Sequence, residues 1–279
     1  MTMISINTNY GGIFAAKASS QSQATVDSAM ERLSTGKRIN FAKDDAAGQA
    51  IATRLTAEVD GLAMASRNAA DAQSMLDTAE GALSETHTIL LRMRELAVQS
   101  ANGTLTNNDR LHTDAEFQQL EAEITRISDN TKWAGKALIN GDAATGSNPL
   151  VFQVGEGASQ TITVAIADMA ASATGIALHD DAVSTAAKAQ TAITALDTAI
   201  ATVSTERGKL GAVSNRLTST MNNLDQVSIN LSASKGRIED ADFAAETGNL
   251  AKGQILQQAA TAMLAQANAS KQQVLTLIR

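Results

Sequence analysis

The sequence predicts a mainly α-helical protein: a long antiparallel helical coiled-coil rod with paired N- and C-terminal segments and a small β-hairpin in the middle. Two repeats predict this fold class. In the C-terminal half, apolar residues recur every seven positions at Leu196, Val203, Leu210, Leu217, Leu224 and Leu231. In the N-terminal half, a series of the same period comprises Leu76, Leu83, Leu90 and Ala97. Because only other long helices can bury such narrow stripes, we expect the two ends of the chain to pack on each other.

The composition agrees with closely packed helices. Aromatic residues make up only 3% of the 279 residues, and the single proline, Pro149, lies between the two repeats. Proline is the strongest helix breaker, so both flanks lack the residue that would interrupt them. The sequence has no cysteine, which excludes disulfides, thiolate metal sites and cysteine catalysis.

The charge pattern argues against nucleic acid as a partner, and the lack of a long apolar stretch argues against membrane insertion. The chain has 22 basic and 29 acidic residues, a net charge of −7, and no basic stripe interleaved with aromatic residues. No apolar stretch approaches the roughly 20 residues that a membrane span needs. Residues 1–10 also lack the basic run and apolar segment of a cleaved secretory signal, so export would need another route.

The N-terminal half predicts three helices. After a short extended start, residues 1–40 form an amphipathic helix with Val26, Met30 and Leu33 on one face. A loop at 36–45 precedes a second helix, whose apolar pattern continues to Gln99 and predicts a length of about 55 residues. An Asn- and Gly-rich turn then leads to a third helix, which ends before a closing segment at 130–141. The apolar face of this third helix comprises Phe117, Leu120, Ile124 and Ile127.

The middle and the C-terminal half have different periods. Two alternating runs around a Gly-containing loop predict a β-hairpin at about 150–166. A long helix is expected from about Thr185 to Leu231, followed by a break at 232–236 and a last helix. The apolar face of the last helix comprises Leu256, Ala260, Met263, Ala267, Val274 and Ile278. The terminal helices are thin and rich in alanine, so we expect them to become ordered only when copies of the chain pack together.

Several stretches, in the same order along the chain, resemble bacterial flagellins, the subunits of the flagellar filament. They are ERLSTGKRIN at 31–40, AKDDAAGQAIATRL at 42–55, RMRELAVQSANGT at 92–104, RISDNTKWAGKAL at 126–138, SKGRIEDADFAAET at 234–247 and AMLAQANASKQQVLTLIR at 262–279. The resemblance covers residues 4–140 and 186–279. The short middle implies that the large outer domains of many flagellins are missing.

This resemblance implies a structural subunit, without enzymatic activity or cofactor, that polymerises into a helical filament. Residues 1–43 and 237–279 would form an inner terminal-helix domain, and residues 44–236 a rod domain that carries the hairpin. The chain would be secreted through the flagellar export apparatus, guarded by a chaperone, and added beneath the filament cap, above hook-junction proteins. The expected self-assembly residues are Val26, Met30, Leu33, Leu256, Met263, Leu264, Val274 and Leu277. The last five are also those that the chaperone would mask.

The resemblance further implies a surface for a Toll-like receptor of host innate immunity around the RELAVQ stretch. It comprises Leu90, Arg92, Arg94, Glu95, Leu96, Gln99 and Glu116. Leu91 stands where the family often has Gln, and this difference bears on how strongly the receptor would recognise the chain. On the residues alone, Leu90 and Leu96 could equally be packing residues and the charged residues a solvated face.

Other constellations predict no chemistry. His87, His112 and His179 are far apart and lack metal-ligand spacing, and there is no H-E-x-x-H motif. Two acidic clusters are expected to cap helices, although cation binding is the alternative for both. They are Asp44 with Asp45, and Asp240 with Asp242. The Ser- and Thr-rich middle could carry O-linked sugars or be an ordinary polar loop.

Three rival functions fit parts of the sequence. A hook–filament junction protein has similar terminal helices, but the resemblance at 31–55 and 92–104 favours a flagellin. An enzyme-bearing flagellin or a polysaccharide-binding surface adhesin is the rival from another class; the short middle leaves little room for a catalytic domain, and no acid–base pair stands out there. A soluble coiled-coil scaffold would not explain the thin, alanine-rich ends.

Overall fold

The apolar repeats form long helices in the computed structural model, which describes residues 8–144, 148–171, 176–178 and 182–276, the side chains of 272–276 excepted. The chain divides into two units. One comprises Met1–Val59 with Asn230–Arg279, and the other comprises Asp60–Ile229. Helices α2 (Ala46–Ala101) and α4 (Ala186–Glu239) contribute residues to both units. The predicted mainly helical fold class, with paired terminal segments and a hairpin, is confirmed.

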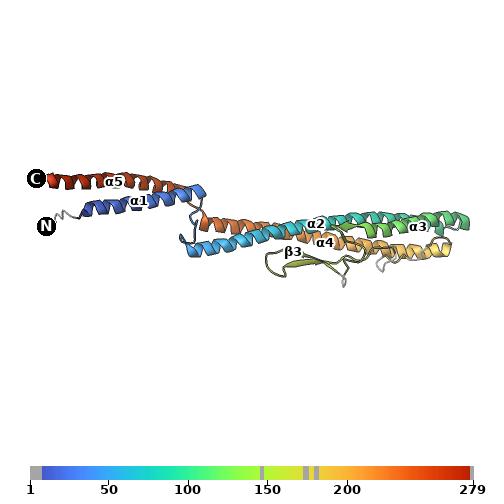
Figure 1. The fold of residues 1–279 in the computed structure, drawn as a ribbon. Coiled ribbons are helices and arrows are strands. Elements are labelled where there is room, and N and C mark those ends of the chain that lie inside the picture. Colours follow the sequence, from blue (N-terminus) through green and yellow to red (C-terminus); the bar gives the residue numbers. More distant parts are fainter. Residues whose placement is uncertain (1–7, 145–147, 172–175, 179–181, 277–279) are drawn as a thin grey trace. The chain divides into compact units, whose positions relative to one another are not determined.

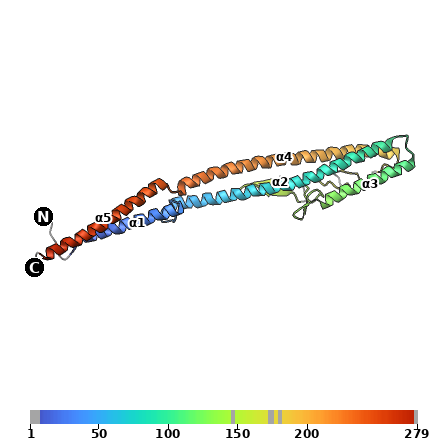
Figure 2. The same ribbon diagram turned by 90° about the horizontal axis from the view of Figure 1, so that it is seen from above.

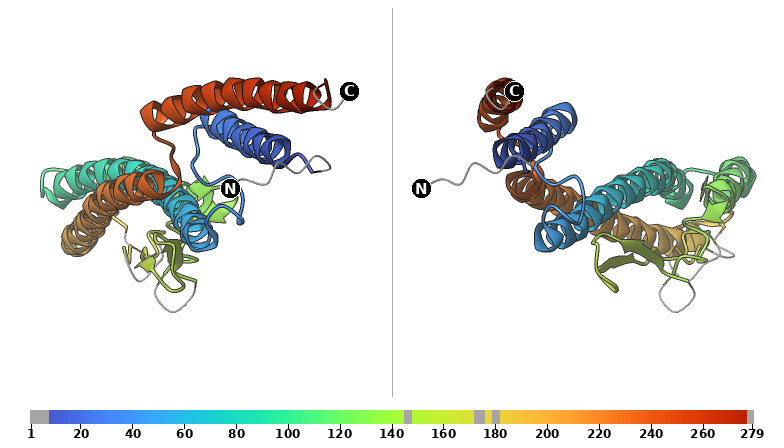
Figure 3. Two further views of the ribbon diagram at one scale, coloured as in Figure 1. Left: turned by 90° about the vertical axis from the view of Figure 1, so that its left-hand side faces the viewer. Right: turned by 60° about the vertical axis from the view of Figure 1, so that its left-hand side comes forward.

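The first unit is built on a pair of helices, α1 (Tyr10–Thr35) and α5 (Phe243–Thr276), which lie side by side in Figures 1 and 3. The Asn9 side chain caps α1 by accepting a hydrogen bond from the Gly12 N–H. Gly36 ends α1 in a left-handed conformation with φ of 72°, and its N–H donates to the Arg32 carbonyl. Asn9 also donates to Asn268 over 3.1 Å, which joins the two helices near their outer ends.

The predicted caps are confirmed for both acidic clusters. Asp45 Oδ1 accepts a hydrogen bond from the Gly48 N–H at the start of α2. Asp242 Oδ1 accepts from the Ala244 N–H at the start of α5. Asp44 Oδ2 instead accepts from the Phe41 N–H within the preceding loop, and this hydrogen bond lowers the Asp44 pKa below its ordinary value.

The second unit is a set of long helices in which α2 and α4 run antiparallel (Figures 1 and 2). Polar pairs connect them along their length, from Ser66–Asp225 through Glu80–Arg207 to Arg94–Asp197. Helix α3 (Asn107–Asn130) returns beside α2, and Phe117 and Ile124 on it are fully buried. Both seven-residue repeats supply the core, as predicted: the four residues of the α2 repeat are buried, and the α4 repeat is buried from Leu196 to Leu224.

The predicted break at 232–236 is wrong, because α4 continues to Glu239. The segment contains one glycine and no proline, and a glycine in a helix costs only about 1 kcal/mol. The Asp240 N–H still donates to the Gly236 carbonyl in the helical manner. The chain leaves the helix only after Glu239, where Asp242 caps α5.

The predicted β-hairpin is confirmed. Strands β3 (Leu150–Gln153) and β4 (Thr161–Val164) pair antiparallel, with Leu150 opposite Val164 and Phe152 opposite Ile162. Ile162 and Val164 point into the core, and Asn68 of α2 donates to the Gln153 carbonyl. The hairpin is thereby fixed to the second unit.

A second, smaller hairpin follows α3 and was not predicted. Strands β1 (Lys132–Trp133) and β2 (Lys136–Ala137) are two residues each, too short to produce a period in the sequence. Ala134 and Gly135 make the turn with φ of 47° and 84°, the left-handed conformation of tight hairpin turns. Trp133 packs half-buried against the core, as expected for a residue that anchors this segment.

Candidate assembly and recognition surfaces

The α1–α5 pair is held together by small residues. On α5 the buried positions Glu246, Gly253 and Ala260 recur every seven residues, and Ala15, Ser22 and Ala29 do the same on α1. A Cβ built on Gly253 would lie 2.7 Å from Cγ2 of Val26, so the two helices approach closely because this position is glycine. Such a contact buries little apolar area within the chain.

The larger apolar side chains of α1 and α5 are exposed instead. We call them the terminal apolar set: Tyr10, Ile13, Phe14, Met30, Ile255, Leu256 and Met263. Phe14 is 76% exposed and Met263 64%. A groove of about 730 Å³ lies between the two helices, and Phe14, Leu256 and Met263 contribute to its lining. Exposed apolar groups gathered along a groove are typical of an interaction site.

The eight predicted self-assembly residues fall into different environments. Val26 is buried between α1 and α5, and Leu33 and Leu264 are half-buried. Met30, Leu256 and Met263 are exposed, so Met30 does not share the buried face of Val26 as the helical spacing predicted. The side chain of Val274 and the whole of Leu277 lie outside the described residues. Helical spacing could not show that the alanine and glycine stripe of α5, rather than its larger residues, faces α1.

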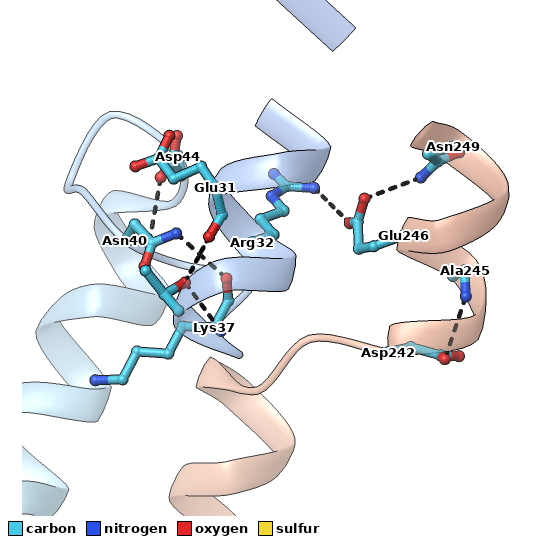
Figure 4. Close-up of polar contacts among 10 residues, drawn as sticks. Glu31, Arg32, Lys37, Asn40, Asp44, Asp242, Ala245, Glu246 and Asn249 are labelled. Carbon is cyan, nitrogen blue, oxygen red and sulfur yellow. Dashed lines mark hydrogen bonds and ion pairs between the residues drawn. The ribbon is translucent and has the colours of Figure 1, made fainter. Parts of the chain in front are cut away.

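An ion pair ties the end of α1 to the start of α5, and Figure 4 shows its residues. Arg32 Nη1 donates to Glu246 Oε1 over 2.9 Å, and Asn249 Nδ2 donates to Glu246 Oε2 over 3.2 Å. Burial by itself would raise the pKa of Glu246, but the hydrogen bonds from Arg32 and Asn249 outweigh burial and lower this pKa below its ordinary value.

Backbone hydrogen bonds join the loop after α1 to the end of α4. The Arg38 N–H donates to the Glu239 carbonyl over 2.7 Å, and the Ala241 N–H donates to the Gly36 carbonyl over 2.9 Å. Lys37 adds an ion pair with Glu239. The stretches ERLSTGKRIN and SKGRIEDADFAAET, which are about 200 residues apart in sequence, therefore meet in one junction.

The RELAVQ region places five of its seven predicted residues at the surface. Arg92 makes ion pairs with Glu116 over 2.8 Å and with Glu95 over 3.0 Å, and hydrogen bonds to these two carboxylates raise the Arg92 pKa. Arg94 pairs with Asp197, and Gln99 is exposed. The other two predicted residues, Leu90 and Leu96, are only 0% and 2% exposed and belong to the core. Their assignment to a surface was therefore wrong: both leucines pack in the core, and the charged residues of the same stretch lie at the surface.

The comparisons with known proteins agree with this architecture. A family model described as the bacterial flagellin N-terminal helical region matches residues 6–144, and one for the bacterial flagellin C-terminal helical region matches residues 193–278. A flagellin of Halalkalibacterium halodurans is 45% identical over 251 residues, which cover 90% of this chain and 91% of that protein.

The chain belongs to the bacterial flagellin family.

Other flagellar proteins are similar along nearly the whole chain. A flagellin of Bacillus subtilis is 44% identical over 98% of this chain and 99% of its own length. The flagellar filament 33 kDa core protein of Treponema phagedenis is 39% identical over the same shares. The crystal structure of Bacillus cereus flagellin has a TM-score of 0.50 and 36% identity, and it covers 57% of this chain and 88% of that one. This chain is a structural subunit of the flagellar filament.

One comparison concerns the fold alone. The structure of a putative flagellar hook-associated protein from Vibrio parahaemolyticus has a TM-score of 0.61 and 18% identity. It covers 71% of this chain and 100% of that one. The fold is thus similar in the two proteins, while the family matches concern flagellins.

Two of the three histidines lie on helices of the second unit. His87 is half-buried on α2, His112 is exposed on α3, and His179 lies outside the described residues. In the part of the chain that the structure describes, there is no group of three or more His, Cys, Asp or Glu side chains suited to a metal ion. Within the same part, none of the helices combines the length and apolar character needed to span a membrane.

Arg110 is a structural residue that the sequence reasoning missed. Its buried guanidinium donates from Nε to the Ser100 carbonyl over 2.8 Å, from Nη2 to the Asn102 carbonyl over 2.9 Å, and from Nη1 to Asn107 Oδ1. It thus satisfies carbonyls at the C-terminal end of α2, where a positive charge is favourable. The nearby capping box of Thr106 and Asp109, which starts α3, could have been found from its spacing.

Proposed function

We propose that copies of the chain contact one another in the filament through the terminal apolar set on α1 and α5. The exposure of these side chains, together with the groove beside Phe14, Leu256 and Met263, is the observation that carries the proposal. Small residues hold α1 to α5, so the larger apolar side chains are available to a second copy. Burying one such side chain contributes about 1.5–3 kcal/mol. A helical polymer repeats this gain at every subunit.

Substitutions on the exposed face test this proposal in the full chain. We expect Leu256→Ser and Met263→Ser each to raise the critical concentration for polymerisation about tenfold, because about 1.4 kcal/mol corresponds to that factor. Leu111→Ser is the matched control, since Leu111 is a similarly exposed apolar residue of α3 in the other unit. Its critical concentration should stay within about twofold of the parent.

Sedimentation and negative-stain microscopy after seeding measure the polymer, and circular dichroism verifies that helix content is unchanged. If Leu111→Ser impaired assembly as strongly as Met263→Ser, replacing any exposed apolar residue with serine would reduce polymerisation, and the proposed surface would be wrong.

We propose the same division of the chain that the resemblance implies. Residues 1–43 and 237–279 form the inner domain, and residues 44–236 form the rod domain with the hairpin. Support comes from the end of α1 at Thr35 and the start of α5 at Phe243, near these boundaries. Limited proteolysis of the monomer should first remove the terminal segments, with cuts before residue 45 or after residue 239, and leave the rod domain between them. A first cut inside 60–100 would contradict the division.

We infer that the chain is secreted through the flagellar export apparatus and reaches the extracellular filament beneath its cap, above the hook-junction proteins. A chaperone masks Leu256, Met263, Leu264, Val274 and Leu277 before export. The exposure of Leu256 and Met263 supports a need for masking, since exposed apolar groups promote aggregation. Calorimetry with the chaperone should give weaker binding for Met263→Ser than for Leu111→Ser, and equal affinities would contradict the masking.

We also propose that the subunit acts without enzymatic activity, and that the monomer presents Arg92, Glu116 and their neighbours to a Toll-like receptor. The support is the exposure of these charged side chains above the buried Leu90 and Leu96.

A further inference from the structure

The chain contains two Asn–Gly pairs, Asn102–Gly103 and Asn140–Gly141, which the structure places in opposite surroundings. An asparagine before glycine can lose its side-chain amide, because the next backbone nitrogen meets no Cβ when it attacks the side-chain carbonyl carbon. We propose that Asn102 is a site of spontaneous deamidation in the folded chain, and that the fold protects Asn140.

Asn102 lies in the exposed turn between α2 and α3, directly after the last residue of α2. The space beside Gly103 is open: a Cβ there would meet nothing within 4 Å. Among the described residues, the Gly103 N–H and the Asn102 side-chain NH₂ donate to no acceptor. Neither the attacking nitrogen nor the leaving group is therefore held by a hydrogen bond that it donates.

The polar groups around Asn102 favour the reaction. The Thr104 N–H donates to Asn102 Oδ1 over 3.2 Å, and this oxygen becomes negative when the carbonyl carbon is attacked. The Asp142 N–H donates to Asn140 Oδ1 in the same way over 3.1 Å, so this contribution is common to both sites.

The Arg110 guanidinium lies 2.9 Å from the main-chain carbonyl oxygen of Asn102. The attack begins when the Gly103 nitrogen loses its proton, and the negative charge is then shared with the Asn102 carbonyl oxygen to which this nitrogen is conjugated. The positive charge of Arg110 beside that oxygen stabilises the anion.

Asn140 also precedes a glycine, but it has a restraining environment. Its side-chain NH₂ donates to Asp142 Oδ2 over 3.2 Å, so the leaving group is held. A Cβ on Gly141 would lie 3.1 Å from the Asp168 side chain, which shows how closely that carboxylate approaches. The preceding residue, Ile139, is fully buried, and its carbonyl accepts a hydrogen bond from the Met169 N–H. The hydrogen bond that holds the leaving group and the two nearby carboxylates, Asp142 and Asp168, therefore oppose the attack.

The reaction balances without an oxidant or reductant. The Gly103 nitrogen forms a bond to Asn102 Cγ, and the bond from Cγ to Nδ2 breaks. The proton of the Gly103 N–H leaves with Nδ2 as ammonia, and a five-membered succinimide remains. Water then opens this ring at either carbonyl to give aspartate or isoaspartate. In the isoaspartyl product, the former main-chain carbonyl becomes a free carboxylate, and its oxygen is the one that Arg110 Nη2 contacts.

The test is incubation of the full chain at mildly alkaline pH, followed by peptide mass spectrometry with fragmentation that distinguishes isoaspartate. In the folded chain we expect Asn102 to react at least about tenfold faster than Asn140, a difference of about 1.4 kcal/mol in the barrier. In urea the tenfold difference should shrink, since the folded surroundings are then lost and both sites keep the Asn–Gly pair.

Gly103→Ala is the matched variant, because its Cβ enters open space and Gly103 does not require a left-handed backbone. It should slow deamidation at Asn102 at least about tenfold through crowding of the attacking nitrogen and leave Asn140 unchanged. Equal rates at the two sites in the folded chain, or an unchanged rate at Asn102 in Gly103→Ala, would overturn the proposal.

Discussion

Two glycines of α5 give a matched pair of substitutions that isolates the close packing of α5 on α1. Gly253 and Gly248 both lie inside the helix, and neither has a left-handed backbone. Replacing either with Ala removes the same helix penalty, about 1 kcal/mol. Only at Gly253 does the new Cβ meet another side chain, 2.7 Å from Cγ2 of the stiff Val26.

The magnitudes follow from these surroundings. Gly248→Ala should stabilise the full chain by about 1 kcal/mol, because its Cβ meets nothing within 4 Å. At Gly253 the overpacking cost of about 1–3 kcal/mol offsets the helix gain, so we expect a net change from about zero to 2 kcal/mol destabilising. The difference between the two variants, about 1–3 kcal/mol, is the packing contribution of the α1–α5 contact.

The assay is thermal unfolding of the full chain and of seeded filaments, followed by circular dichroism. We expect a higher melting temperature for Gly248→Ala than for Gly253→Ala in the filaments, where α1 and α5 are packed. Equal stabilisation by the two substitutions would show that Val26 and Gly253 are not in close contact, and the described pairing of α1 with α5 would be refuted.

Three further predictions concern charged residues. Arg110→Ala should destabilise the full chain in urea by about 2–3 kcal/mol, because the buried Ser100 carbonyl and the Asn102 carbonyl just after α2 lose charge-assisted hydrogen bonds; a loss below about 0.5 kcal/mol would contradict that role. The folded-state pKa of Glu246 is lowered, so its stabilising contribution is complete above the ordinary value of 4.5 and is lost as the pH falls through the lower folded value. The stability of the α1–α5 pair should therefore depend less on acidic pH in Glu246→Gln than in the parent. If variant and parent had identical pH profiles, Glu246 would not be the group whose protonation destabilises the pair. Arg92→Ala should reduce receptor signalling by the purified monomer, and equal activity of variant and parent would remove Arg92 from the recognition surface.

The two long repeats made most of the fold predictable. Leu83 and Leu217 are examples of residues at seven-residue spacing whose burial follows directly from the pattern. The hairpin at 150–166 was likewise predictable, because alternation over four or five residues distinguishes a strand from a helix. Strands of two residues, such as Lys132–Trp133, are too short to alternate and could be found only in the structure.

The surfaces were less predictable, because periodicity groups residues on a helix face without saying what that face meets. Met263 and Ala260 lie on the same helix, and the structure buries the alanine and exposes the methionine. The close approach of α1 at Gly253 decides which face of α5 is buried. That approach depends on Val26, which lies on a helix more than 200 residues away in sequence. Arg110 was missed for a similar reason: its partners are backbone carbonyls, which leave no mark in the sequence.

Hydrogen exchange measured on the monomer and on the assembled filament tests the central claim most directly, namely that α1 and α5 present the surface on which copies of the chain assemble. We predict that polymerisation strongly increases protection of the amides in α1 and α5. The core of α2 and α4 around Leu83 and Leu210 should already be protected in the monomer. Protection that increased only within α2 and α4, with α1 and α5 unchanged, would contradict the account.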